Sequence, residues 1–395
     1  MFLYSGFFAK KVSLYPNLVR WLGPEPILWL IYKAAVRFML TTIMSTKLIP
    51  CGLALFYNRT ERRLRTLWRL LIVIFLGLAG GAIFRLLATS LIVFFLLITL
   101  QIPLDVVGRD QALTQAINTV FMRFPLLFGL RSLLVLWIIG GAFVLVARWL
   151  DNRHWRDYGF HCTPTWWRDL TFGLCVGVGL MALIFGLEYG CGWVAVNGLF
   201  ENTQRQLPFW PLWVDSLFAT LLVGTQEEWF ARGYLLQNLA EGLYGPRSPA
   251  KGAVFIAYLL TSLFFGFLHI NNPHATLTSS LTLALFGLCV GLGFILTGEL
   301  AIPIGLHIGW NFAQGAIFGF PVSGADTHLS LLATQQSGPT IWTGGAFGPE
   351  GGLLGPLALL LGALMVYGWM RWTGRQVFIQ AALARYSQLP HKTKE

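Results

Sequence analysis

Residues 275–319 read ATLTSSLTLALFGLCVGLGFILTGELAIPIGLHIGWNFAQGAIFG and contain a single charged residue, Glu299. The uncharged runs on its two sides, 275–298 and 300–319, each reach the length of about 20 apolar residues that a helix needs to cross a bilayer core. In hydrocarbon every backbone N–H and C=O group must be paired within its own segment, so runs of this kind form helices. This stretch therefore predicts two consecutive transmembrane helices.

The same pattern extends over the rest of the chain. Asp, Glu, Lys and Arg are also absent from 86–104, 132–147, 170–187, 252–268 and 351–370. Alternation with a period of two residues, the mark of a membrane β-barrel, is absent. We expect spans near 70–104, 130–149, 170–194, 210–239, 251–269, 276–298, 300–319 and 351–371. The predicted fold is all-α, a polytopic transmembrane helix bundle of about eight spans.

Composition supports the same class of protein. Of the 395 residues 55% are hydrophobic and 11% are charged, whereas soluble domains carry about 25% charged residues. This excludes a soluble enzyme, a disordered chain and a disulfide-stapled secreted domain. None of the five cysteines forms a CxxC pair, so they are expected to be small buried residues and not a disulfide or zinc framework.

The net charge of +11 arises from 28 Lys+Arg against 17 Asp+Glu. The basic residues gather at the ends of the predicted spans, near 59–69, 148–168, 247–251 and 371–394, as the positive-inside rule expects of cytoplasmic loops. We therefore expect contact with a lipid bilayer and no nucleic-acid site. The expected location is a multi-pass integral membrane protein of a bacterial plasma membrane, with a cytoplasmic C-terminus.

Polar groups inside the predicted spans are the candidate functional residues, because a charge at the bilayer centre costs about 2.5–3.5 kcal/mol on insertion scales. The first group is Gln226-Glu-Glu-Trp-Phe-Ala-Arg232. Glu228 and Arg232 are four residues apart, so they share a helix face and can pair. Glu227 then points elsewhere, and an unpaired carboxylate there suits a general base. The alternative is a helix end in solvated headgroups.

A second group contains Phe265 and His269, at the end of the next predicted span. The ring of Phe265, one turn earlier, can pack on the imidazole and fix its orientation; the alternative is an ordinary interfacial histidine. Glu227 lies about 16 residues before the turn near 243–250 and His269 about 19 residues after it. Antiparallel helices therefore place these two side chains at similar depth.

His307 and Asn311 form a third group, in an otherwise uncharged span. They are four residues apart and share a helix face, where their N–H groups can donate to a developing oxyanion. The alternative is a hydrogen bond between helices. His307 lies only about eight residues past the turn at Gly298-Glu299, so strong tilt or a late helix start is needed to bring it level with Glu227.

Other features receive simpler interpretations. Glu188, near the end of a span, is expected to be interfacial, and 320–350, with Asp326 and Glu350, is expected to be a loop. The octapeptides FGLCVGVG at 172–179 and FGLCVGLG at 286–293 are nearly identical, and each contains GxxxG. Small residues at this spacing allow close approach of helices; they indicate either a repeat or ordinary glycines of membrane helices.

The motifs EExxxR (Glu227, Glu228, Arg232), FxxxH (Phe265, His269) and HxxxN (His307, Asn311) together resemble the CPBP family of intramembrane proteases. This family includes the CAAX prenyl endopeptidases and bacteriocin-processing or immunity proteins. The resemblance implies an endopeptidase with a membrane-embedded site that cuts a peptide or membrane-protein substrate, prenylated in the CAAX branch. Glu227 and His269 would activate a water, His307 and Asn311 would stabilise the oxyanion, and Glu228, Arg232 and Phe265 would support them.

The resemblance also implies a domain organisation. Residues 1–130 are expected to be an N-terminal interfacial and membrane-helix region. Residues 131–372 would be the protease-like helical core, and 373–395 a basic cytoplasmic tail.

A metal is the open point of this resemblance, since the family is often labelled metalloprotease. Glu227, His269 and His307 would supply the two His and one carboxylate of a catalytic zinc site. HExxH is absent, and the resemblance favours a metal-free, glutamate-dependent mechanism with no cofactor. Two other functions stay open: a transporter or proton-relay protein, because buried Glu and His also serve there, and a non-catalytic protein of the immunity type.

Overall fold

The computed structural model describes residues 56–58, 61, 63–73, 75, 141, 145, 149–202, 208–326 and 329–386. The chain divides into two compact units, Met1–Tyr57 and Asn58–Glu395, and the fold described below is that of the second. Most of the expected spans near 70–104 and 130–149, and the expected domain boundary at residue 130, lie outside the described residues.

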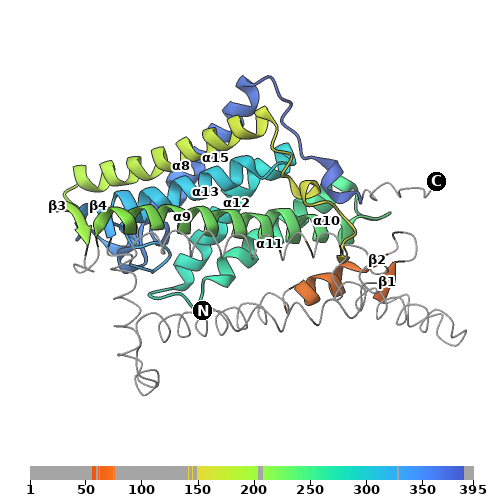
Figure 1. Ribbon diagram of the computed structural model, residues 1–395, viewed down its shortest axis with the longest axis horizontal. Coiled ribbons are helices and arrows are strands. Elements are labelled where there is room, and N and C mark those ends of the chain that lie inside the picture. Colours follow the sequence, from red (N-terminus) through yellow and green to blue (C-terminus); the bar gives the residue numbers. More distant parts are fainter. Residues whose placement is uncertain are drawn as a thin grey trace, which may run out of the picture. The chain divides into compact units, whose positions relative to one another are not determined.

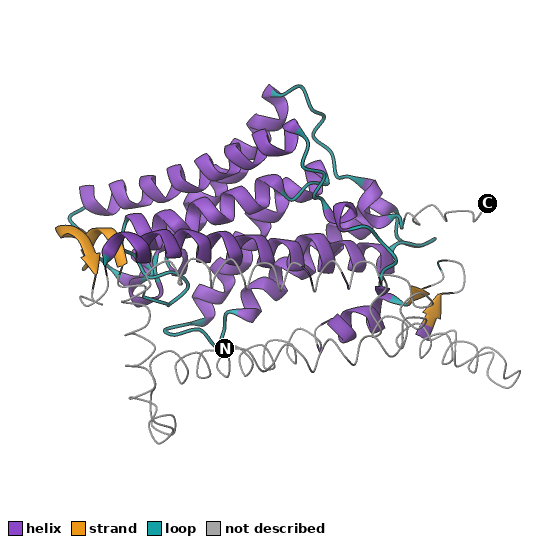
Figure 2. Cartoon of the chain, in the orientation of Figure 1, coloured by secondary structure: helices purple, strands orange, loops and turns teal. Residues whose placement is uncertain are grey.

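Helices dominate the described part of the chain (Figures 1 and 2). The α-helices are α8 (Pro164–Gly190), α9 (Phe209–Glu228), α10 (Gln237–Leu243), α11 (Ala250–Leu268), α12 (Leu277–Thr297), α13 (Ala301–Phe312), α14 (Thr340–Thr343) and α15 (Leu354–Trp372). Two π-helical segments continue α9 and α13, namely η3 (Trp229–Leu236) and η4 (Ala313–Ile317). Short 3-10 turns are η2 (Trp155–Tyr158), η5 (Gly345–Phe347), η6 (Pro349–Gly351) and η7 (Ala381–Ala384). The strands are β1 (Tyr57–Asn58), β2 (Arg63–Leu64), β3 (Val194–Asn202) and β4 (Leu329–Gln336).

Four of these helices, α8, α11, α12 and α15, are long and apolar enough to cross a membrane. The continuous helical stretch α9–η3–α10 and the pair α13–η4 occupy the two other spans expected between residues 210 and 319. The chain is thus an integral membrane protein of mostly helical fold. The expected total of about eight spans is not confirmed by the four.

Local sequence explains where the helices begin and end. Thr163 caps α8 by accepting from the backbone N–H of Trp166, and the next residue is a proline, which suits a first helical position. Gly298, at φ +75°, ends α12 in the left-handed conformation that favours glycine. The turn at Gly298 sends α13 back against the other helices.

The closest helix contact joins α8 and α13, which lie side by side (Figure 1). A Cβ built on Gly177 of α8 would overlap the carbonyl oxygen of Leu306, and one on Gly309 of α13 would overlap that of Leu174. Gly173 and Gly305 are packed in the same way. Two GxxxG motifs therefore face each other, and the backbone of α13 around His307 is pressed against α8.

The second copy of the octapeptide has different neighbours. On α12, a Cβ on Gly287 would meet Ser262 and Arg232, and one on Gly291 would meet Tyr258. Gly287 makes room for the backbone of Ser262 and for the guanidinium of Arg232, and Gly291 makes room for the Tyr258 ring, whereas Gly173 and Gly177 of α8 make room for the backbone of α13. The two octapeptides thus serve different packing tasks.

An antiparallel ribbon of β3 and β4 was not expected from the sequence. Val194 pairs with Gln336 and Asn202 with Leu329, with an irregularity after Val196. Figure 2 shows the ribbon at one end of the bundle. The prediction of an all-α fold misses it, and the prediction of a simple loop over 320–350 is wrong for 329–336, because the two strands lie far apart in sequence and neither reveals its partner locally.

Three arginines expected at the basic membrane surface are buried instead. Arg63, Arg69 and Arg153 are each at most 3% exposed. Arg69 Nη1 donates to Asp151 Oδ1 over 2.8 Å, and both Arg63 and Arg153 pair with Glu241 of α10. Buried guanidinium groups require such partners. These ion pairs therefore connect three parts of the chain: the segment 63–73, the residues before α8 and the end of α10.

Candidate active site

Glu227 and Glu228 are the last two residues of α9, and Arg232 follows in η3. Arg232 Nη1 donates to Glu228 Oε1 over 2.8 Å, so the pair expected from the four-residue spacing is present. The side chain of Glu228 is fully buried, whereas that of Glu227 is 37% exposed. The two neighbouring carboxylates thus have different surroundings: one is held by a buried guanidinium and the other opens toward a cavity.

His307 lies between these carboxylates. Its Nδ1 is 2.8 Å from Glu228 Oε1, and its Nε2 is 3.9 Å from Glu227 Oε2. The second distance is too long for a hydrogen bond and leaves room for a shared polar atom such as a water. The ring of Phe286 packs edge-on against the His307 imidazole, with the two ring centroids 5.2 Å apart.

The depth of His307 follows from the position of the α12–α13 turn. Leu300, which precedes α13, packs against Gly233 of η3, and its backbone N–H donates to the carbonyl of Gly159 over 3.0 Å. This turn therefore lies beside η3, five residues past Glu228, and not level with the end of α10. Because α13 starts beside η3, His307 reaches the level of Glu228 without a strong tilt of α13.

His269 follows α11 directly, and its ring lies against Phe265, with centroids 4.8 Å apart. Its Nδ1 is 2.8 Å from the carbonyl oxygen of Phe265. Because a carbonyl only accepts, Nδ1 carries the proton, and Nε2 of the neutral ring is left as an acceptor. Phe265 also stacks under Arg232, whose guanidinium carbon lies 4.8 Å from the ring centroid.

A cavity of about 300 Å³ joins the first two groups. Its walls come from the end of α9, η3, the end of α11 and the turn after it, and are formed by Glu227, Phe230, Ala231, Phe264, Phe265, Leu268, His269 and Asn272. Glu227 and His269 therefore open into one cavity, whose other lining residues are apolar except Asn272. His307 approaches Glu227 from α13, where it is 3% exposed.

Asn311 is half-buried on α13, one turn beyond His307. The structure gives its side-chain amide no hydrogen bond to another of the described residues. Its expected part in the site therefore rests on the shared helix face with His307.

The donor set can be compared with a zinc site. Nε2 of both imidazoles and the carboxylate of Glu227 are the required ligand types. Among the residues that the structure describes, however, no three His, Cys, Asp or Glu side chains are grouped so that they would hold a metal ion.

Glu350 is a neighbour of the site that the sequence analysis missed. It is 2% exposed, and its carboxylate accepts from the indole N–H of Trp310 over 3.2 Å and from Ser323 Oγ over 2.6 Å. Burial raises the pKa of Glu350, and the hydrogen bonds from Ser323 and Trp310 oppose that rise. Nothing in the local sequence of a glycine-rich loop signals such a residue.

Glu188 is likewise buried and not interfacial as expected. It is fully buried at the end of α8 and accepts from Gln336 Nε2 of β4 over 2.7 Å. The partner belongs to the ribbon, which explains why it was not visible from the sequence.

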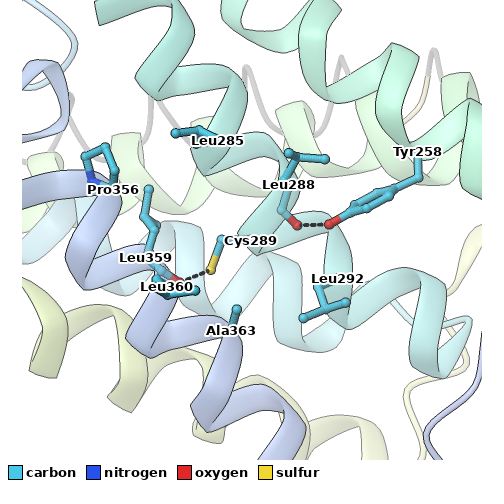
Figure 3. Close-up of a pocket in the computed structure, with 9 residues that line it drawn as sticks. All are labelled: Tyr258, Leu285, Leu288, Cys289, Leu292, Pro356, Leu359, Leu360 and Ala363. Carbon is cyan, nitrogen blue, oxygen red and sulfur yellow. Dashed lines mark hydrogen bonds between the residues drawn. The ribbon is translucent and has the colours of Figure 1, made fainter. Parts of the chain in front are cut away.

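A second hollow, also of about 300 Å³, lies between α11, α12 and α15 (Figure 3). Its lining is apolar apart from Tyr258 and Cys289. The hydroxyl of Tyr258 donates to the carbonyl of Leu288, and Cys289 Sγ lies 3.0 Å from that of Leu359. Both polar groups are thus satisfied, and this hollow lacks the charged side chains of the Glu227 cavity.

The chain is an integral membrane protein, and its apolar helices surround a polar site. Carboxylate and imidazole side chains lie close together in this site, and two of them, those of Glu227 and His269, line a cavity. Residues 208–313 match the family described as Rce1-like, type II CAAX prenyl endopeptidase Rce1-like. The chain contains an Rce1-like domain, and this match confirms the family predicted from the three motifs, all of which lie within it. Neither a comparison with curated proteins nor one with solved structures gave a match.

The Rce1-like family is a protease family, which supports a peptidase at the family level, with a peptide substrate in a membrane setting. The label metalloprotease gains no support from the match.

Proposed function

We propose that this protein is an intramembrane endopeptidase that hydrolyses a peptide bond with a water activated by Glu227 and His269. The observation that carries the proposal is the convergence of Glu227 with His269 in one cavity and with His307 at 3.9 Å. All three residues lie within the Rce1-like match. A partly exposed carboxylate that is not hydrogen-bonded to either of two neighbouring imidazoles is suited to general-base hydrolysis.

The reaction proceeds by water attack. Glu227 accepts a proton from a water that His269 Nε2 also orients, and the water oxygen bonds to the peptide carbonyl carbon. The oxyanion accepts from His307 Nε2–H and from the amide of Asn311. Collapse breaks the C–N bond, Glu227 returns the proton to the leaving amine, and the products are a carboxylate and an amine. Fixed donors in a dry cavity stabilise the oxyanion more than water does.

The supporting residues orient this machinery. With Nδ1–H of His307 donated to Glu228, a proton on Nε2 makes that nitrogen the donor on the side of Glu227. Arg232 compensates the buried charge of Glu228, and Phe265 packs against both Arg232 and His269. We propose that this mechanism needs no metal.

The substrate class follows from the family description. We propose a membrane-presented peptide, with a prenylated C-terminal Cys-containing tail as the first substrate to test. Purified full-length protein in liposomes is given farnesylated and unmodified forms of one such peptide, and products are identified by mass spectrometry. Cleavage is expected for a membrane-bound form, and a metal chelator is expected to leave the rate unchanged. A chelator-sensitive rate restored by added zinc would contradict the metal-free mechanism.

The same preparation tests the alternatives. Proton or solute flux that is lost in Glu227→Ala, without peptide cleavage, would indicate a transporter. Full biological rescue by Glu227→Ala would indicate a non-catalytic protein of the immunity type.

We also propose an orientation in a bacterial plasma membrane. Arg156 and Arg168 near the start of α8, and Arg371 and Arg375 near the end of α15, lie at the ends of helices that can span the bilayer. The positive-inside rule favours a cytoplasmic location for the start of α8 and the end of α15, and therefore for the C-terminus that follows α15.

A further inference from the structure

Glu350 is a buried carboxylate that the proposed mechanism does not use. It lies in η6, just before α15 and outside the Rce1-like match. Removing a carboxylate from water is costly unless donors compensate for the lost hydration. The groups that donate to Glu350 therefore show which parts of the fold it holds.

One carboxylate oxygen holds α13. Oε2 accepts from the indole N–H of Trp310, a fully buried residue three positions after His307. The indole ring packs edge-on against Phe286, with centroids 5.7 Å apart, and Phe286 in turn packs against His307. Glu350 thereby fixes the helix face next to the His307 ring.

The other oxygen holds the turn after α11. Oε1 accepts from both the backbone N–H and the hydroxyl of Ser323. The carbonyl of Ser323 accepts from Asn272 Nδ2 over 2.9 Å, and the backbone N–H of Asn272 donates to the carbonyl of His269 over 3.1 Å. Ser323 has a φ of +48°, a conformation that a non-glycine residue keeps only when its surroundings hold it.

Resting on the function proposed above, we propose that Glu350 is a positioning residue that sets the His269 ring relative to the His307 ring. It does so by receiving donors from Trp310 on one helix and, through Ser323 and Asn272, from the turn that carries His269. This one carboxylate links the elements that bear the two imidazoles.

Because each carboxylate oxygen of Glu350 accepts from a different part of the fold, the test variants are chosen to remove these connections. Glu350→Gln keeps the shape but presents an amide N–H₂ to either Trp310 or Ser323, so one of the two connections is lost. Trp310→Phe keeps an aromatic ring but removes the indole donor and part of the buried ring volume. The matched control is Glu201→Gln in β3, a partly buried glutamate whose described hydrogen bond is to Ser330 Oγ over 3.3 Å.

Two readouts are measured on the full-length protein in liposomes. The first is hydrogen–deuterium exchange of the backbone amides at 269–276 and 320–326. We expect exchange to become about tenfold faster in Glu350→Gln and to stay unchanged in Glu201→Gln, because hydrogen bonds to charged groups are among the stronger ones. The second is peptide cleavage, for which we expect kcat to fall about ten- to hundredfold with little change in KM, as misplaced catalytic groups give.

A double variant tests the route. If the indole N–H acts through Glu350, Glu350→Gln combined with Trp310→Phe lowers kcat by less than the two single losses multiplied together. Fully additive losses would contradict that route.

The proposal is overturned if Glu350→Gln has wild-type exchange at both segments and wild-type kcat. It is also overturned if exchange accelerates equally over the whole bundle, including α8, because Glu350 would then support the fold only. If Glu350→Gln does not accumulate, Ser323→Ala, which removes the hydroxyl that donates to Oε1, supplies the exchange readout, and Trp310→Phe, which removes the donor to Oε2, supplies the kcat readout. The exchange measurement needs no substrate, so its failure is distinguishable from failure of the proposed function, which would appear as full cleavage by Glu227→Ala.

Discussion

Nδ1 of His307 lies 2.8 Å from Oε1 of Glu228, so the buried carboxylate contacts the imidazole as well as Arg232. Sequence spacing indicated only the pair with Arg232. Glu228 thus orients a ring of the site directly, as carboxylates do for functional histidines elsewhere. This contact makes Glu228 testable as an orienting residue.

We expect Glu228→Gln to lower the cleavage rate about 10–100-fold, as loss of a carboxylate that orients a histidine does. The substitution also leaves Arg232 buried without its counter-ion, which costs stability. Combining it with Arg232→Met should therefore recover thermal stability without recovering activity. Cleavage at the wild-type rate by a folded Glu228→Gln protein would contradict the orienting role.

The glycine contact between α8 and α13 gives a second prediction. Gly309→Ala would force a Cβ onto the carbonyl oxygen of Leu174, and we expect it to destabilise the protein by about 1–3 kcal/mol, as overpacking does. Cleavage should also decrease, because α13 carries His307. Thermal unfolding in detergent and the cleavage assay measure the two effects.

Gly179→Ala is the matched control. This glycine lies on the exposed face of α8, and a Cβ there would meet no atom of the described residues within 4 Å. We expect wild-type stability and activity. Equal losses in Gly309→Ala and Gly179→Ala would contradict the close approach of α8 and α13.

Native cysteines on either side of α8 test the orientation. Cys162 precedes the helix and Cys191 follows it, and both are exposed, so the prediction of buried cysteines is wrong for these two. In variants that keep one of them, we expect a membrane-impermeant maleimide to label Cys191 on intact cells and Cys162 only after permeabilisation. Partial burial raises the pKa of the Cys162 thiol, which lowers its thiolate fraction, so labelling requires mildly alkaline pH. The reverse labelling would contradict the cytoplasmic basic end, and labelling of both from one side would contradict α8 as a span.

The helices of the site region were predictable because apolar runs of membrane length permit few other structures. The three motifs were recognisable because Glu227, His269 and His307 stand out in such runs. Their mutual depth was less predictable, since the level of the α12–α13 turn depends on Leu300 packing against Gly233 and not on residue counts.

The features missed by the sequence analysis all depend on partners distant in the chain. Glu350 is held by Trp310 and Ser323, and Glu188 is held by Gln336 of the ribbon. Arginine clusters were assigned to the membrane surface because hydropathy does not show that a counter-ion such as Glu241 will meet Arg63 and Arg153. Spacing along one helix reveals pairs such as Glu228 and Arg232 but none of these.

The most direct test of the central claim is the cleavage rate of a membrane-presented peptide by Glu227→Ala, measured on folded protein in liposomes beside wild type and Glu201→Gln. We expect wild type and Glu201→Gln to cleave at the same rate. We expect the rate of Glu227→Ala to fall at least about 10²-fold, the lower range for a general base. A folded Glu227→Ala protein that cleaves the verified substrate at the wild-type rate would contradict the account.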